Sequence, residues 1–176
     1  MPQTAAPLIS DEYRALNRRV HEGDPSWGGS GGRFAPLVAR LAERLGTWDI
    51  LDYGCGKGSL AAALGREIHG YDPAVPALAA APNPAAIVTC FDVLEHVEPD
   101  CIDAVLDHLA ELTLQFGFFV VATRPAIKVL PDGRNAHLIQ APAAWWTAQI
   151  GRRFKIVQAE DVGGRECAYL VARRPR

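Results

Sequence analysis

The sequence has no long hydrophobic run and no marked excess of charge of either sign. Its longest apolar runs have the length of a strand, far below the roughly 20 residues that a membrane-spanning helix needs. The net charge of −2 gives no overall attraction to duplex nucleic acid. The first residues, MPQTAAPLIS, lack the basic and apolar regions of a secretory signal. We therefore expect a cytoplasmic protein with no membrane partner.

Cysteine is also sparse, and its spacing excludes the common thiol motifs. The four cysteines form no C-x-x-C pair, and Cys90 and Cys167 lie in apolar, strand-like runs. Small buried thiols in a reducing compartment are the expectation for such a pattern.

What the sequence does contain is an alternation of helical and strand-like segments. The 176 residues, 49% of them hydrophobic, suffice for one domain with a full core. Periodicity and apolar runs predict helices at 8–21, 34–45, 99–114 and 141–151, and strands at 48–53, 66–72, 85–91, 116–123, 154–160 and 167–174. This order predicts an α/β fold with a mostly parallel sheet covered on both faces. The last two strands, joined by a short turn, predict an antiparallel hairpin at one edge.

The first 33 residues differ from the rest of the chain. We expect residues 1–33 to form an N-terminal helical cap and a glycine-rich segment, and residues 34–176 to form the main domain. The segment GDPSWGGSGGRF is either a flexible connector or a substrate loop. Trp27 favours the second interpretation, since a large aromatic side chain needs a surface to pack on.

One glycine motif directly follows a predicted strand. In LDYGCGKGSLAAAL, Gly54, Gly56 and Gly58 open a helix. Glycines permit a sharp turn and a close approach of the backbone to a ligand, and the first turn of a helix has free N–H groups. The spacing is neither the dinucleotide fingerprint nor a P-loop. The motif predicts either a ligand-binding turn or a tight turn with no ligand.

Asp72 ends the next predicted strand, about one βα unit further along the chain. A carboxylate in this place can accept hydrogen bonds from both hydroxyls of a ribose. The alternative is an Asx turn or an N-cap before Pro73. Ligands of open α/β sheets bind outside the carboxyl ends of the strands, so we expect Asp72 and the glycine turn to share one site.

The stretch FDVLEHVEPD places Asp92, Glu95 and His96 directly after a third predicted strand. One interpretation is structural: Asp92 caps a turn, and Glu95 lies near a helix start, where negative charge is favourable. The other is a site. His137 lies in the loop that leaves the neighbouring strand, so it can reach the same edge of the sheet. Two carboxylates and two imidazoles could bind a divalent ion such as Mg²⁺ or Mn²⁺.

Three segments in this order, ILDYGCGKGSLAAAL, HGYDP and FDVLEHV, resemble the motifs of the class I S-adenosylmethionine-dependent methyltransferases. The resemblance covers about residues 34–172 and implies a Rossmann-like methyltransferase fold with S-adenosylmethionine as cofactor. It implies that Asp52 and the glycine turn hold the methionine part of the cofactor. It also implies that Asp72, which ends the second strand, holds the ribose. The cofactor-binding residues so implied are Asp52, Gly54, Cys55, Gly56, Gly58, Asp72, Phe91 and Asp92.

The chain departs from this family between Asp72 and Ala85, where only PAVPALAAAPNP remains. The family usually has a helix, a strand and an adenine-contacting acidic loop here. Four prolines leave no room for all three. We therefore expect the strand that the family has in this interval, which is the third strand of its fold, to be reduced or missing here.

A narrower resemblance concerns the acids and histidines. The metal-dependent small-RNA 2′-O-methyltransferases place acid-x-x-Glu-His after the same strand, with a further histidine before an aromatic-rich helix. The ubiquinone-pathway O-methyltransferases share acid-x-x-Glu-His. The matching residues, which are the implied metal ligands, are Asp92, Glu95, His96 and His137. Trp145 and Trp146 match the aromatic-rich helix.

These motifs predict methyl transfer to a hydroxyl, or an amine, of a small acceptor such as a sugar, a nucleotide or a metabolite. The transfer requires an acceptor atom about 3 Å from the methyl group and removal of its proton. The candidate catalytic residues are His137, His96 and Asp92.

Two alternatives stay open. One acceptor is the 2′-hydroxyl of an RNA end, helped by Arg134, Arg152 and Arg153. The other alternative is a cofactor-binding regulatory protein without turnover. The remaining histidines, His21, His69 and His108, belong to no cluster in the sequence and are interpreted as structural or surface residues.

Overall fold

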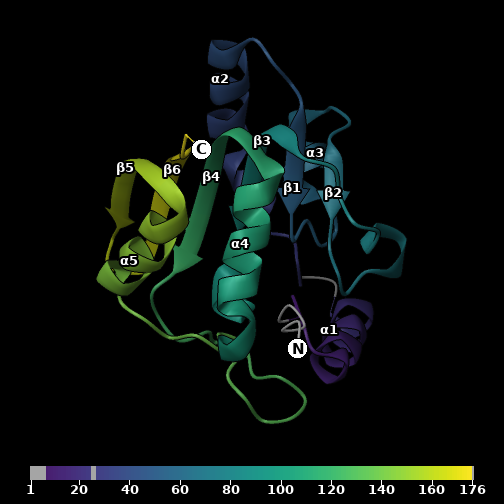
Figure 1. Cartoon of the computed structure of the whole chain (residues 1–176). Coiled ribbons are helices and arrows are strands. Elements are labelled where there is room, and N and C mark those ends of the chain that lie inside the picture. Colours follow the sequence, from purple (N-terminus) through teal and green to yellow (C-terminus); the bar gives the residue numbers. More distant parts are fainter. Residues whose placement is uncertain (1–6, 25–26, 176) are drawn as a thin grey trace, which may run out of the picture.

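The computed structural model describes residues 7–24 and 27–175, which form a six-stranded sheet between two layers of helices (Figure 1). The strands are β1 (Ile50–Tyr53), β2 (His69–Tyr71), β3 (Ala85–Phe91), β4 (Thr113–Ala122), β5 (Phe154–Val162) and β6 (Glu166–Arg173). The α-helices are α1 (Asp11–Gly23), α2 (Ala35–Leu45), α3 (Ser59–Leu64), α4 (Ile102–Leu112) and α5 (Ala143–Arg153).

The sheet has the order β2-β1-β3-β4-β6-β5. β1 pairs in parallel with β2 and β3, and β3 pairs in parallel with β4. β6 runs antiparallel to both β4 and β5. The predicted α/β fold, a mostly parallel sheet with an antiparallel pair at one edge, is therefore confirmed.

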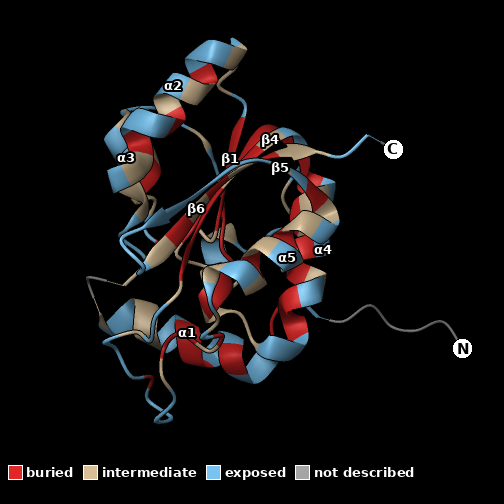
Figure 2. Cartoon of the chain, turned by 90° about the vertical axis from the view of Figure 1, so that its left-hand side faces the viewer, coloured by how far each residue is buried: buried red, intermediate tan, exposed pale blue. Residues whose placement is uncertain are grey.

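Helices cover both faces of the sheet, as Figure 2 shows from the side. α4 and α5 pack on one face, where Leu106 and Trp146 are fully buried in one core cluster. α2 and α3 pack on the other, where Val38 and Leu60 are fully buried in a second cluster. α1 joins neither layer and lies beneath the carboxyl ends of the parallel strands (Figure 1).

The third strand of the family is missing, as predicted. Residues 73–84 contain a single 3₁₀-helix, Pro76–Leu78, and no strand. The backbone N–H of Asp72 donates to the carbonyl of Leu78 at 3.1 Å, which folds the segment into a compact loop. β2, with only three residues, therefore forms an edge of the sheet.

Two element boundaries differ from the predicted ones for local reasons. α1 begins at Asp11 rather than at residue 8, because the Ser10 side chain accepts a hydrogen bond from the N–H of Tyr13 and caps the helix. α4 ends at Leu112, and β4 follows at once from Thr113. The sequence predicts a helix that continues to residue 114, because the apolar pattern continues across this junction.

Candidate active site

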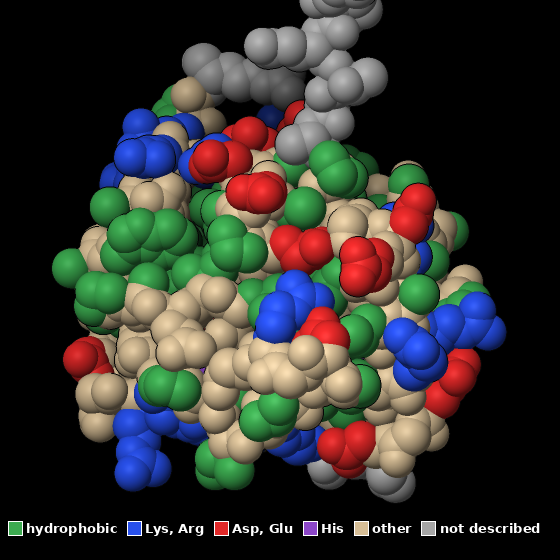
Figure 3. All heavy atoms as spheres, turned by 90° about the horizontal axis from the view of Figure 1, so that it is seen from below, with side chains coloured by type: hydrophobic (Ala, Val, Ile, Leu, Met, Phe, Trp, Pro, Cys, Tyr) green, Lys and Arg blue, Asp and Glu red, His purple; other side chains and the backbone are tan. Residues whose placement is uncertain are grey.

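A cavity of about 600 Å³ opens at the carboxyl ends of the parallel strands. Its walls come from the glycine turn, the segment after β3, the loop after β4, α1 and the segment that follows α1. Figure 3 views the molecule from below and shows acidic and basic side chains interspersed on that face. A volume of this size is typical of a small-molecule site.

The glycine turn is held by contacts on both sides. The N–H of Gly54 donates to the Tyr71 carbonyl at 2.7 Å, which joins the turn to the end of β2. Gly54 has φ +73°, and a Cβ atom there would lie 2.4 Å from Cγ2 of Val93. At Gly56, with φ +52°, a Cβ would lie 2.7 Å from the carbonyl oxygen of Gly28. Both positions require glycine because of backbone conformation and close packing.

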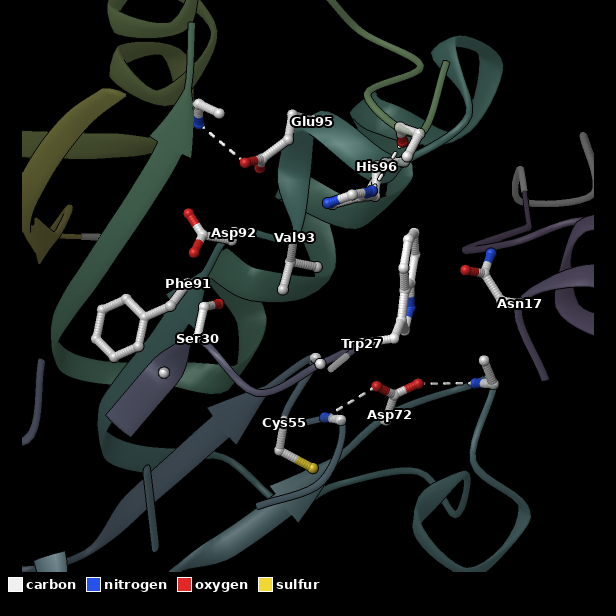
Figure 4. A pocket seen from close by; sticks show the side chains of 18 of the residues that line it. Asn17, Trp27, Ser30, Cys55, Asp72, Phe91, Asp92, Val93, Glu95 and His96 are labelled. Atoms are coloured by element: carbon white, nitrogen blue, oxygen red, sulfur yellow. Dashed lines mark hydrogen bonds between the residues drawn. The ribbon is translucent and has the colours of Figure 1, made fainter. Parts of the chain in front are cut away.

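Two acids lie at this turn: Asp52, near the end of β1, and Asp72, directly after β2. Asp52 is buried and accepts a hydrogen bond from Thr89 Oγ1 at 2.8 Å. Burial raises the pKa of Asp52 to about 6, against the lowering effect of that hydrogen bond. Asp72 accepts from the N–H of Gly56 at 3.1 Å and from the N–H of Ala74 at 2.9 Å (Figure 4). The second bond is the Asx turn that the sequence offered as an alternative to a ligand site.

The glycine-rich segment after α1 packs against this turn. The N–H of Lys57 donates to the Gly28 carbonyl at 3.2 Å, and the N–H of Gly32 donates to Ser59 Oγ at 3.2 Å. The Trp27 ring contacts the His96 ring edge to face, at 5.3 Å between centroids (Figure 4). Of this predicted segment, residues 25 and 26 lie outside the described part. The described residues pack over the site rather than merely connecting two helices.

Asp92 directly follows β3 but turns away from the histidines. It has φ +53° and is the one residue other than glycine with a positive φ in the described part of the chain. Its carboxylate binds Arg33, with Nη2 at 3.0 and 3.2 Å from its two oxygens, and Arg33 also pairs with Glu166 at 2.8 Å. The expected four-residue metal set is thus not assembled, because Arg33 neutralises Asp92 at the cavity entrance.

Phe91 lines the cavity, but its ring belongs to the core. The ring packs against Phe34 at 4.5 Å and against Phe118 at 5.1 Å between centroids. Its side chain therefore fixes the end of β3.

Glu95, His96 and His137 do come together. One potential ligand atom from each lies within 4.8 Å of the other two. Glu95 follows β3 on a short 3₁₀-helix, Leu94–His96, and His137 comes from the loop between β4 and α5. The His96 and His137 rings are edge to face, 4.9 Å apart. Thus three of the four predicted metal ligands meet at one wall of the cavity.

Backbone carbonyls fix the tautomers of both histidines. His96 Nδ1 lies 2.7 Å from the Ala136 carbonyl oxygen, and His137 Nδ1 lies 2.6 Å from the Arg124 carbonyl oxygen. A carbonyl oxygen only accepts, so each Nδ1 carries the proton and each neutral ring keeps a lone pair on Nε2. Metal-binding histidines show this same outer hydrogen bond.

Burial keeps this cluster uncharged at neutral pH. It lowers the pKa of His96 to about 4, with a further contribution from His137, and it lowers the pKa of His137 itself. Burial also raises the pKa of Glu95 to about 8, assisted by the charge of Asp92. Glu95 Oε1 accepts from the Ala122 N–H at 2.9 Å, while buried Oε2 has no partner among the described residues. A buried carboxyl group with one unpaired oxygen, in one cluster with two imidazoles that keep a lone pair on Nε2, fits a divalent cation.

Sequence reasoning missed three cavity residues on α1: Tyr13, Asn17 and His21. His21 Nε2 lies 4.0 Å from Asp72 Oδ2, although the sequence had suggested only a structural or surface role. Their spacing of four residues, which places them on one helix face, was the available signal.

The chain belongs to the methyltransferase-domain family, whose model matches residues 27–163. No curated protein matches the sequence. The six-stranded sheet, with acids and a glycine turn at the carboxyl ends of β1 and β2, is that of an S-adenosylmethionine-dependent methyltransferase.

Solved structures share this fold at low sequence identity. The 1,6-didemethyltoxoflavin-N1-methyltransferase of Burkholderia thailandensis, with its namesake compound and S-adenosylhomocysteine bound, is 19% identical with a TM-score of 0.68, over 98% of this chain and 94% of that one. Magnesium protoporphyrin IX methyltransferase of Synechocystis PCC 6803, with bound S-adenosylhomocysteine, is 18% identical with a TM-score of 0.58, over 93% and 97%. The N-methyltransferase NodS of Bradyrhizobium japonicum WM9, in complex with S-adenosylhomocysteine, is 11% identical with a TM-score of 0.60, over 92% and 99%.

Each of these three structures contains bound S-adenosylhomocysteine. Among the described residues, no helix has the length and apolar character needed to cross a membrane.

Proposed function

We propose that the protein methylates a hydroxyl oxygen of a small acceptor, which the Glu95–His96–His137 cluster binds and deprotonates. The observation that carries this proposal is the cluster of Glu95, His96 and His137, in which both imidazoles have a fixed tautomer and one carboxyl oxygen is unpaired. The cluster lines the same cavity as the glycine turn. Such groups can accept a proton or bind a cation, and an acceptor hydroxyl needs one or the other.

The residues at the ends of β1 and β2 fit the two halves of the cofactor. We assign ionised Asp52 to the ammonium of the methionine part and Asp72 to the ribose hydroxyls. The backbone at Gly54, Cys55, Gly56 and Gly58 borders the methionine part. Burial raises the pKa of the Cys55 thiol to about 12, so its thiol stays protonated and only its backbone is assigned a role. S-adenosylmethionine supplies an electrophilic methyl group on a sulfonium.

The histidines have the protonation state that a general base needs. Because both pKa values are lowered, both rings are neutral at pH 7 and can take the acceptor proton at Nε2. His137 is assigned as the base, and His96 as the residue that orients it through their edge contact. Asp92, held by Arg33, positions the end of β3 at the entrance.

The same three residues would hold a divalent ion, with Glu95 Oε2 and the two Nε2 atoms as ligands. When bound, such an ion lowers the pKa of a coordinated hydroxyl. Asp92 is left out of this proposed set because its carboxylate pairs with Arg33. Three protein ligands leave positions for an acceptor.

The proposed small acceptor fits the charge distribution better than an RNA end does. Two of the three arginines that could assist RNA binding pair with acids: Arg153 with Asp103 and Asp107, and Arg134 with Asp132. Arg152 donates to Gln149 Oε1 at 2.9 Å. Two of the structural neighbours are named as methyltransferases of small molecules, a didemethyltoxoflavin and magnesium protoporphyrin IX. Both observations support a small acceptor.

The test measures thermal unfolding in saturating S-adenosylhomocysteine with and without Mn²⁺ or Mg²⁺. We expect the ion to raise the midpoint of wild type but not of His137→Ala, since binding to the native state stabilises it. His69→Ala, an exposed histidine away from the cavity, is the matched control and should behave like wild type. Equal ion responses in all three proteins would contradict the metal site.

Methyl transfer is tested next with labelled cofactor and a panel of sugars, nucleotides and catechols. We expect transfer to at least one hydroxylated compound, and its loss in His137→Ala. Transfer only to short single-stranded RNA, with strong salt dependence, would replace the small acceptor by an RNA end. Tight cofactor binding with no transfer to any component of a cell extract would indicate a regulatory protein instead.

A further inference from the structure

α1 presents a buried polar face to the cavity. Tyr13, Asn17 and His21 are spaced by four residues, so they lie one above the other along the helix, about 6 Å apart per step. All three line the cavity, and Tyr13 and Asn17 retain only 3% and 8% exposure. Figure 4 shows the Asn17 side chain directed from α1 toward the cavity. Most polar side chains of a surface helix face water, so this buried row needs an explanation.

Two atoms of this row have no hydrogen-bond partner. Tyr13 Oη and His21 Nδ1 are buried and unpaired within the described part of the chain. An unpaired buried polar atom costs free energy, and a ligand that supplies complementary groups removes that cost. The Tyr13 ring packs in an apolar cluster, and Asn17 Nδ2 donates to the Tyr13 carbonyl at 3.2 Å. The two unpaired atoms at the ends of the row are therefore the groups that a ligand would satisfy.

The position of the row matches the base and ribose of the cofactor. His21 Nε2 lies 4.0 Å from Asp72 Oδ2, so one end of the row lies beside the acid assigned to the ribose. Asn17 and Tyr13 follow at one and two helical turns from that acid, in the direction of Glu98, whose carboxylate accepts hydrogen bonds from the N–H and Oγ of Ser10 at 2.8 and 2.7 Å.

The loop that would otherwise contact adenine has no side chain for the purpose. Residues 73–84 carry no charged side chain, and their single polar side chain, Asn83, is exposed and does not line the cavity. With the third strand missing, α1 is the polar wall that remains on this side.

We propose that Tyr13, Asn17 and His21 form the surface that recognises the adenosine part of S-adenosylmethionine. His21 contacts the ribose together with Asp72, and Asn17 and Tyr13 contact the edge of the adenine. The N-terminal helix thus replaces the acidic loop that the chain lacks. This inference rests on the proposed assignment of Asp72 to the ribose.

Calorimetric titration with S-adenosylhomocysteine and with S-inosylhomocysteine, in which an oxo group replaces the 6-amino group, tests the proposal. Wild type should prefer the adenine compound. Asn17→Leu should weaken S-adenosylhomocysteine binding about tenfold, the size of one lost hydrogen bond, and bring the ratio of the two dissociation constants close to one. Arg19→Leu, on the exposed face of α1, should change neither value.

Tyr13→Phe separates recognition from folding. It removes only the unpaired hydroxyl, so the melting temperature of the ligand-free protein should stay equal or rise while the dissociation constant of S-adenosylhomocysteine rises severalfold. A purely structural Tyr13 would leave that constant unchanged. Unchanged affinity and unchanged ratio in both Asn17→Leu and Tyr13→Phe would overturn the proposal.

Asp72→Asn identifies which assumption has failed. If Asp72→Asn weakens binding and the α1 variants do not, the adenosine surface is wrong and the ribose assignment stands. If Asp72→Asn has no effect on the affinity for S-adenosylhomocysteine, the ribose assignment itself is wrong and the proposal falls with it.

Discussion

At the scale of single residues, the proposed pairing of Asp52 with the cofactor ammonium predicts an affinity that depends on pH. Its pKa is raised to about 6 by burial and by the charge of Asp72. Above pH 6 the carboxylate is ionised and can pair with the cofactor ammonium; below pH 6 it is protonated and cannot. We therefore expect the dissociation constant of S-adenosylhomocysteine to rise as the pH falls below 6, by up to about tenfold per pH unit. Calorimetry between pH 5 and 8 measures this.

Asp52→Asn is the control for that pH dependence. The variant should bind weakly at pH 7 and show a flatter profile between pH 5 and 7. His21, whose pKa is lowered by burial and which faces Asp72, still titrates in the variant. The difference between the two profiles therefore isolates Asp52. An affinity of wild type that is constant from pH 5 to 7 would contradict the assignment.

Gly54 is a second single position with a measurable effect. An alanine Cβ would lie 2.4 Å from Val93 Cγ2 in a backbone with φ +73°, so Gly54→Ala should lower the free energy of unfolding by about 2–4 kcal/mol. In a Val93→Ala background, Gly54→Ala should lose most of the steric part, because only Val93 Cβ at 3.2 Å remains, and keep a backbone cost of about 1–2 kcal/mol. Chemical denaturation measures both.

Gly133 provides the matched comparison. It has φ +87°, and a Cβ there would meet nothing within 4 Å. Gly133→Ala should show the backbone cost alone. If Gly54→Ala were no more destabilising than Gly133→Ala, the packing of Val93 against the turn would not constrain it.

At the scale of elements, the start of α1 depends on the Ser10 side chain, which makes two hydrogen bonds. Ser10 Oγ accepts from the Tyr13 N–H at 3.1 Å and donates to Glu98 Oε1 at 2.7 Å. Ser10→Ala should lower the free energy of unfolding by about 1–2 kcal/mol. Ser10→Asp keeps a helix cap but sets a second negative charge beside Glu98, so it should be stabilised by adding Glu98→Gln. Additive effects of Ser10→Asp and Glu98→Gln would contradict this coupling.

The sequence alone predicts those helices and strands that follow from a local pattern of residues. Alternating periodicities gave the order of helices and strands, and four prolines excluded the third strand. Boundaries failed where a side chain outside the periodic pattern sets them, as Ser10 does for α1. Asp72 and the glycine turn could be brought together from sequence because parallel strands present their carboxyl ends at one edge.

Long-range pairing could not be predicted from the sequence. Arg33 lies 59 residues before Asp92, and no local rule says that their side chains meet. That contact separates Asp92 from the histidines. The polar row on α1 was missed for a similar reason: its spacing was visible, but only the packing of α1 beneath the sheet turns that face toward the cavity.

At the scale of the whole molecule, the N-terminal segment and the sheet share the cavity between them. The segment is fastened at both ends of α1, through Ser10 to Glu98 and through the Asp24 carbonyl, which accepts from Lys57 Nζ at 2.6 Å. Central strands such as β3 are buried throughout, whereas α1 has one exposed face. Local opening of α1 should therefore cost less than global unfolding, and cofactor binding should suppress it.

Hydrogen exchange measures this coupling between the opening of α1 and ligand binding in the cavity. With S-adenosylhomocysteine at 100 times its dissociation constant, amides that exchange through opening of α1 should slow by up to about 100-fold, and amides near the glycine turn should slow with them. Amides of β3 and β4 exchange only through larger openings. We expect the 100-fold slowing for those amides that exchange through global unfolding. Protection of the glycine turn without any protection of residues 11–23 would show that the ligand contacts the sheet alone, because a helix that forms a wall of the bound cavity cannot open while the ligand is in place.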